Sequence, residues 1–108
     1  MVTVNYKQTK DNFKLTIAGH AQCGEKGNDL VCCAVSTITY TLAQALIDIQ
    51  NRLKEPPTIY LEEGLAFIEC EANGWKSDLE TAKCIFHVGL SGFKLLQSNY
   101  PEAVTVID

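Results

Sequence analysis

The sequence predicts a single α+β domain, residues 1–108, in which an antiparallel or mixed sheet is packed with two helices. Three features predict this class. Apolar residues alternate with polar ones in short segments, as they do in half-buried strands, and they recur at helical spacing in two longer segments. Glycines, prolines and polar residues typical of turns separate these segments. The expected order is ββαββα, with a candidate short closing strand at residues 104–107.

The strands are predicted in two hairpins. Period-two alternation covers the segments 2–6, 13–17 and 65–71, and residues 58–62 are also predicted as a strand. The polar stretch 8–11 is typical of a hairpin loop between the first two segments. A Glu63-Gly64 turn joins the last two, and in segment 65–71 we expect Ala66, Ile68 and Cys70 to share one face.

Helical spacing predicts the first helix over residues 29–53. Asn28 or Asp29 is a suitable N-cap, and Pro56-Pro57 prevents the helix from continuing. The second helix is predicted to begin at a capping box, residues 77–80, and to end near Asn99. The apolar stripe of the first helix is Val31, Val35, Ile38, Leu42, Leu46, Ile49 and Leu53.

The second helix has two apolar stripes on nearly opposite sides, and a helix of this kind usually buries both. We therefore predict a homodimer that uses the second stripe; the alternative is a helix sandwiched inside one domain. The first stripe is Leu79, Ala82, Phe86, Leu90 and Phe93, and the second is Cys84, Val88, Gly92 and Leu95.

Composition and charge exclude several classes of function. The net charge is −4 and the basic residues are scattered, so we expect no direct nucleic-acid partner. No apolar run approaches the ~20 residues that span a bilayer, and the N-terminus lacks the pattern of a signal peptide. We therefore expect a cytoplasmic protein without a membrane partner. Five cysteines without a C-x-x-C pair argue against a disulfide framework and against zinc.

The segment between His20 and Cys32 carries the candidate chemistry. His20 follows the second predicted strand, and Cys32 falls in the first turn of the first helix, where free backbone N–H groups favour an anion. A thiolate can act as a nucleophile there, and the same amides can bind an oxyanion. Gly24 and Gly27 make the intervening loop flexible and permit close approach of an extended substrate. The imidazole of His20 and the thiol of Cys32 are two parts of a thiol-based acyl-transfer site.

Helical geometry favours Cys32 over its neighbour as the nucleophile, without excluding Cys33. Ser36 lies one turn after Cys32 on the same flank, whereas Cys33 points about 100° further round the helix. Asp29 either caps the helix or orients His20. The simpler interpretation is that His20 is an ordinary loop residue and Cys32 a buried helix residue without a catalytic role. The residues alone do not decide between this interpretation and a catalytic site.

The same segment resembles the signature of the bacterial ribosomal-processing cysteine protease family, G-H-A-x-x-G-x-x-G-x-D-[IV]-V-C-A-[AG]-[VI]-S. The matching residues agree without a gap: Gly19-His20-Ala21, Gly24, Gly27, Asp29, Val31-Cys32 and Ala34-Val35-Ser36. The similarity extends over essentially the whole chain, including the Glu62-Glu63-Gly64 turn and a C-terminal helix that ends near Tyr100-Pro101. The sequence departs from the family pattern at two positions. Cys33 stands where the family usually has alanine, and Cys23 lies within the loop between His20 and Cys32.

The resemblance implies a homodimeric cysteine endopeptidase with a Cys/His dyad and no metal or organic cofactor. Members of that family remove the N-terminal extension of large-subunit ribosomal protein twenty-seven during ribosome assembly, and the resemblance implies the same activity here. It implies that Cys32 is the nucleophile, that His20 is the general base and acid, and that Asp29 and Ser36 support them. The loop with Gly24 and Gly27 is expected to move on substrate binding.

Two other functions remain as alternatives. A non-enzymatic ribosome-associated binding module would keep its function in the Cys32→Ala variant. A thiol redox protein would use Cys32 with Cys33 or Cys23, although adjacent cysteines form only strained disulfides.

Overall fold

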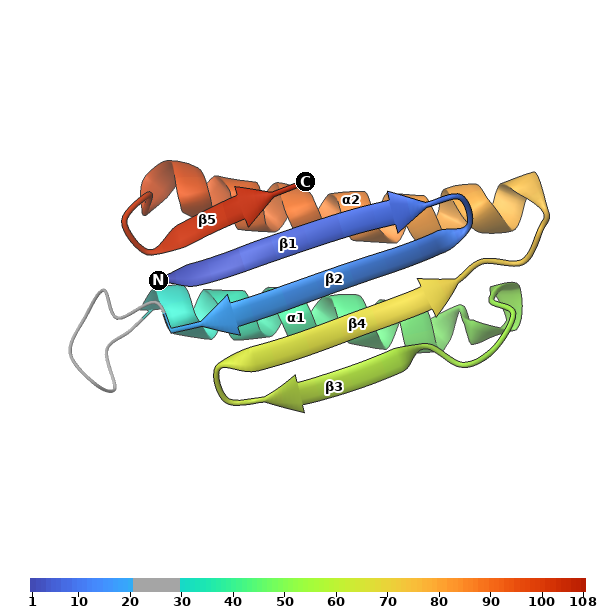
Figure 1. Ribbon diagram of the computed structural model, residues 1–108, viewed down its shortest axis with the longest axis horizontal. Coiled ribbons are helices and arrows are strands. Elements are labelled where there is room, and N and C mark those ends of the chain that lie inside the picture. The colour runs from blue at the N-terminus through green and yellow to red at the C-terminus, as the bar shows by residue number, and fades with distance from the viewer. Residues whose placement is uncertain (21–29) are drawn as a thin grey trace.

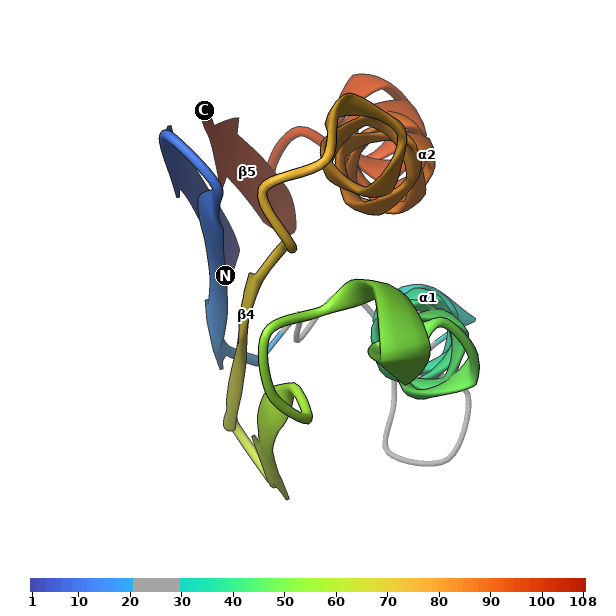
Figure 2. The same ribbon diagram turned by 90° about the vertical axis from the view of Figure 1, so that its right-hand side faces the viewer.

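The computed structural model describes residues 1–20 and 30–108, and these form a five-stranded sheet with two long helices. The strand order is β3-β4-β2-β1-β5, and both helices lie on the same side of the sheet (Figures 1 and 2). The predicted α+β class is therefore confirmed, and so is the closing strand. In chain order the elements are β1 (Val2–Thr9), β2 (Asn12–Gly19), α1 (Leu30–Asp48), the short 3-10 helix η1 (Gln50–Arg52), β3 (Thr58–Glu62), β4 (Leu65–Glu71), α2 (Lys76–Asn99) and β5 (Val104–Ile107).

The sheet is mixed because its last strand returns parallel to its first. β1 and β2 form an antiparallel hairpin, β2 and β4 are antiparallel, and β5 pairs in parallel with β1. The predicted loop 8–11 is too long, because Thr9 still pairs with Asn12 and leaves only Lys10 and Asp11 in the turn. Lys10 has φ 55°, the left-handed backbone that tight hairpin turns require.

The first helix ends at Asp48, earlier than the predicted Leu53. The chain continues as η1, and Leu53 then forms an isolated antiparallel bridge with Ala72. Leu53 is buried in the core from this extended position. The apolar period therefore continues beyond the helix because Leu53 packs in the same core, and periodicity alone does not separate the two cases.

The predicted capping box of the second helix is wrong. The helix begins at Lys76 with Trp75 as its N-cap, and no side chain caps it. The backbone carbonyl of Trp75 accepts hydrogen bonds from the N–H groups of Asp78 and Leu79. Ser77 therefore lies inside the first turn, and Asp78 forms a 3.0 Å ion pair with Arg52.

One hydrophobic core lies between the sheet and the two helices. The rings of Phe13 and Phe86 stack with centroids 5.2 Å apart, and Tyr6 packs on Phe86 at 5.6 Å. The helices approach closely where Gly89 of α2 meets Leu42 of α1, because a Cβ at Gly89 would overlap Leu42 Cδ1. The core thus sets the position of α1, which carries Cys32, relative to the sheet.

The first predicted stripe of α2 is largely buried, whereas the second lies on the surface of the chain. Val88 is 67% exposed and Leu95 is 64% exposed. A helix sandwiched inside one domain is therefore wrong for this chain.

Contrary to the sequence expectation, α1 is by length and composition apolar enough to cross a membrane (mean hydropathy 1.8), a test that core helices of soluble proteins also pass.

Candidate active site

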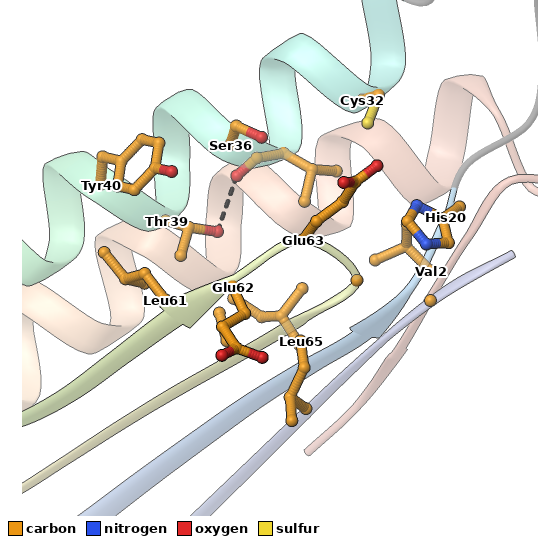
Figure 3. A pocket seen from close by; sticks show the side chains of 15 residues that line it. Val2, His20, Cys32, Ser36, Thr39, Tyr40, Leu61, Glu62, Glu63 and Leu65 are labelled. Atoms are coloured by element: carbon orange, nitrogen blue, oxygen red, sulfur yellow. Dashed lines mark hydrogen bonds between the residues drawn. The ribbon is translucent and has the colours of Figure 1, made fainter.

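A pocket of about 330 Å³ lies between the N-terminal half of α1 and one end of the sheet (Figure 3). It brings together residues from α1, from the end of β2 and from the β3–β4 hairpin. Both candidate dyad residues, His20 and Cys32, line it, and so does Ser36. The remaining lining residues are Val2, Ile17, Gly19, Val35, Thr39, Tyr40, Leu61, Glu62, Glu63, Gly64, Leu65 and Ala66.

His20 is held in place through the backbone on both sides of it. Gly19, the last residue of β2, donates its N–H to the carbonyl of Gly64 (2.9 Å), and the Met1 amino group donates to the carbonyl of His20 (2.6 Å). Gly19 has φ +105°, and a Cβ there would overlap the carbonyl oxygen of Met1. A side chain at Gly19 would therefore disturb the position of His20.

The imidazole of His20 lies over the turn between β3 and β4. Gly64 has φ +80°, and a Cβ on it would be 2.9 Å from Nε2 of His20. A side chain at position 64 would force the ring to shift, and the positive φ itself favours glycine. The Glu63-Gly64 turn predicted from the sequence is thus one wall of the site.

Cys32 is the third residue of α1 and is half-buried in the pocket wall. Its position in the first helical turn gives the site the backbone N–H groups that have no intrahelical acceptor. Ser36 follows one turn later on the same wall. Cys33 is exposed and does not line this pocket, so the structure separates the two neighbouring cysteines.

Glu63 is a candidate that the sequence analysis noted only as part of a turn. In the view of Figure 3 its carboxylate extends between Cys32 and His20. Glu62 is engaged elsewhere: its hydrogen bond with Tyr60, together with weaker desolvation, raises the pKa of that phenol. The described lining contains two glutamates and no lysine or arginine, so the pocket favours a cationic ligand.

Three predicted site residues cannot be placed. Asp29, Gly24 and Gly27 fall outside the residues that the structure describes, as does Cys23. Their expected roles stay predictions.

The fold and the pocket define a class of protein: an α+β domain that places a helix N-terminal thiol and an imidazole in one groove, as thiol-dependent hydrolases do. Residues 1–105 match the family model described as "Cysteine protease Prp". The chain therefore belongs to the Prp family of cysteine proteases. A comparison with curated proteins finds no match.

Solved structures share the fold over nearly the full chain. The ribosomal processing protease Prp of Staphylococcus aureus with a covalently linked product peptide has a TM-score of 0.79 at 22% identity, covering 99% of this chain and 98% of that one. SMU.848 of Streptococcus mutans has a TM-score of 0.69 at 27% identity, covering 99% and 92%. The S. aureus protease with a substrate peptide has a TM-score of 0.69 at 22% identity, covering 98% and 97%.

Proposed function

We propose that this protein removes the N-terminal extension of the precursor of large-subunit ribosomal protein twenty-seven, with Cys32 as the nucleophile and His20 as the general base and acid. The observation that carries the proposal is that both side chains line one pocket at the N-terminus of α1, whereas Cys33 does not. The S. aureus relative is described as a ribosomal processing protease bound to peptides, which supports this substrate.

The reaction begins when His20 accepts the Cys32 proton. The sulfur attacks the scissile carbonyl carbon, and the N–H groups of the first turn of α1 stabilise the oxyanion. The C–N bond then breaks, and the departing amine takes the proton from His20. Water, activated by His20, hydrolyses the thioester and restores the Cys32 thiol. Ser36 and Asp29 support the dyad, and none of these steps needs a cofactor.

The test incubates the purified protein with the precursor and follows cleavage by mass spectrometry. Wild type and Cys33→Ala are expected to release the extension, whereas Cys32→Ala and His20→Ala are expected to lose at least about a thousand-fold in rate. Loss of cleavage in Cys33→Ala alone would reverse the choice of nucleophile. Cleavage that persists in Cys32→Ala would refute the cysteine mechanism.

We further propose that two copies associate through the apolar groove between α1 and α2. This groove encloses about 330 Å³ and is lined by Thr37, Ile38, Thr41, Leu42, Ala45, Cys84, Ile85, Val88, Gly89 and Gly92. Val88 in this lining is exposed, and the exposed Leu95 lies about two turns further along the same face of α2. Its apolar character and the need of a helix to cover two apolar sides support a second copy as the occupant.

Sedimentation at micromolar concentration tests the dimer. Val88→Asp is expected to give monomers, because it places a charge in the apolar contact. Lys83→Asp, at an exposed position about 140° round the same helix, is expected to leave the dimer intact. A monomeric wild type would refute the proposal.

We propose the cytoplasm as the location, because the proposed substrate is a ribosomal protein. Fluorescence microscopy of a tagged protein that retains precursor cleavage tests this. Signal confined to the membrane would contradict it.

A further inference from the structure

Strand β3 is the outer strand of the sheet on the side of the pocket. Within the described chain it pairs only with β4. Thr58 pairs with Glu69 at one end, and Glu62 pairs with Leu65 at the other. The other side of an edge strand presents a row of backbone N–H and C=O groups that an added strand can pair with. β3 therefore offers a peptide-binding edge.

The C-terminal end of β3 lines the same pocket as the dyad. Leu61 and Glu62 of β3 line the pocket opposite Ser36 and Tyr40 of α1 (Figure 3). From Cys32 to Tyr40 the helix rises about 12 Å, the length of three to four extended residues. A polypeptide whose scissile carbonyl lies at Cys32 can therefore continue along β3 for that length.

We propose that the substrate binds as an added β-strand along the open edge of β3, with three to four residues on one side of the scissile bond paired to it. This inference rests on the proposed peptidase function, because it is the position of Cys32 that selects a peptide as the occupant of the edge. Strand addition obtains its affinity from main-chain hydrogen bonds, and pockets for alternate side chains provide its selectivity.

The two sides of the added strand meet different surroundings. Side chains directed toward α1 meet Val35, Leu61 and the ring of Tyr40, which favour an apolar residue. Side chains directed away lie on the side of Tyr60 and Glu62. Pro56 and Pro57 come just before Thr58 and cannot donate a backbone hydrogen bond, so the edge is limited to the length of β3.

A backbone N-methyl scan of a substrate peptide tests the inference. Binding to Cys32→Ala is measured by fluorescence anisotropy, and cleavage by wild type is measured separately. Strand addition predicts that methylation at every second amide weakens binding about five- to ten-fold, the loss for one backbone hydrogen bond, and that the amides between tolerate it. A flat profile, or one without alternation, would overturn the inference.

The two measurements separate the inference from the function on which it rests. Alternating losses of binding without any cleavage by wild type would refute the peptidase and leave the added strand in place. Cleavage with a flat methylation profile would do the reverse. A flat profile together with β3 variants that change the sedimentation coefficient would assign the edge to a second copy of the chain.

A matched pair of proline variants on β3 provides a second readout. Adjacent residues of a strand direct their N–H groups to opposite sides, so one of Tyr60→Pro and Leu61→Pro removes a donor to β4 and the other removes a donor from the open edge. The first is expected to lower the melting temperature strongly. The second is expected to keep its fold by circular dichroism and to bind the unmethylated peptide about five- to ten-fold more weakly. Unchanged peptide binding in both variants would contradict strand addition.

Discussion

The imidazole of His20 lies directly against Gly64, where a Cβ would be 2.9 Å from Nε2. The two residues come from different hairpins, and the bond from the Gly19 N–H to the Gly64 carbonyl ties the end of β2 to the β3–β4 turn. The position of the proposed general base is therefore set by a turn more than forty residues away in the sequence.

Gly64→Ala is expected to displace the imidazole. The new methyl group would crowd Nε2, and alanine is strained at φ +80°. We expect a loss of about a hundred-fold in kcat/KM, together with about 1 kcal/mol of stability. Peptide cleavage and urea unfolding measure the two effects. Gly74→Ala is the control, because nothing lies within 4 Å of its Cβ position. Full activity in Gly64→Ala would contradict the proposed positioning of the His20 ring by this turn.

Glu63→Gln is expected to weaken the capture of basic peptides. The described pocket lining has two carboxylates and no lysine or arginine, and Glu62 already accepts a hydrogen bond from Tyr60. Because Glu63 is exposed, water screens its charge, and we expect only a two- to five-fold rise in KM, on the order of a surface ion pair. The rise should shrink with added salt. Glu55→Gln, exposed just before β3, serves as the control. Equal effects of the two variants would exclude a local role of Glu63.

Sequence periodicity was sufficient for most of the fold but not for the ends of its helices. The bounds of β3 and β4 agree with the predicted segments. Ala66, Ile68 and Cys70 are buried on one face of β4, as expected. Leu53 continued the helical period but is buried from an extended bridge, and Ser77 looked like a cap although Trp75 is the N-cap. Such differences depend on tertiary packing, which a local pattern does not contain.

The site was predictable where a local rule applied and not where distant segments meet. The helical positions of Cys32 and Ser36 follow from spacing, and both line the pocket. The contact between His20 and Gly64, and the approach of Glu63, depend on how two hairpins align in the sheet. The Glu62-Glu63-Gly64 turn was the signal that could have identified Glu63.

Phe86→Ala is expected to cost about 3–5 kcal/mol of unfolding free energy, because it removes a fully buried ring that stacks on Phe13 and contacts Tyr6. Chemical denaturation measures the change. Lys83→Ala, on an exposed position of the same helix, should change stability by less than about 0.5 kcal/mol. If Phe86→Ala changed the unfolding free energy as little as Lys83→Ala, α2 would not pack on the sheet as described.

Stability is expected to fall above pH 9. Burial, and to a lesser extent Glu69, raises the pKa of the Cys70 thiol from 9.0 to about 12. Burial, with a smaller effect of Cys70, raises the pKa of the Tyr6 phenol from 10.0 to about 12. The unfolded chain thus releases these protons first, so the stabilisation is complete below the unfolded pKa and is lost as pH rises toward 12. Urea unfolding across this range should show the decline, and Cys70→Val should reduce its slope. A slope unchanged in that variant would contradict the assignment.

The acyl-enzyme is the most direct test of the central claim, that Cys32 attacks the scissile carbonyl with the help of His20. Wild type mixed with excess precursor and quenched in acid within one turnover is analysed by intact mass and peptide mapping. We predict a thioester of the released extension on Cys32, strongly reduced in His20→Ala and missing in Cys32→Ala, with Cys33 unmodified. An adduct on Cys33, or turnover by Cys32→Ala at the wild-type rate, would contradict the account.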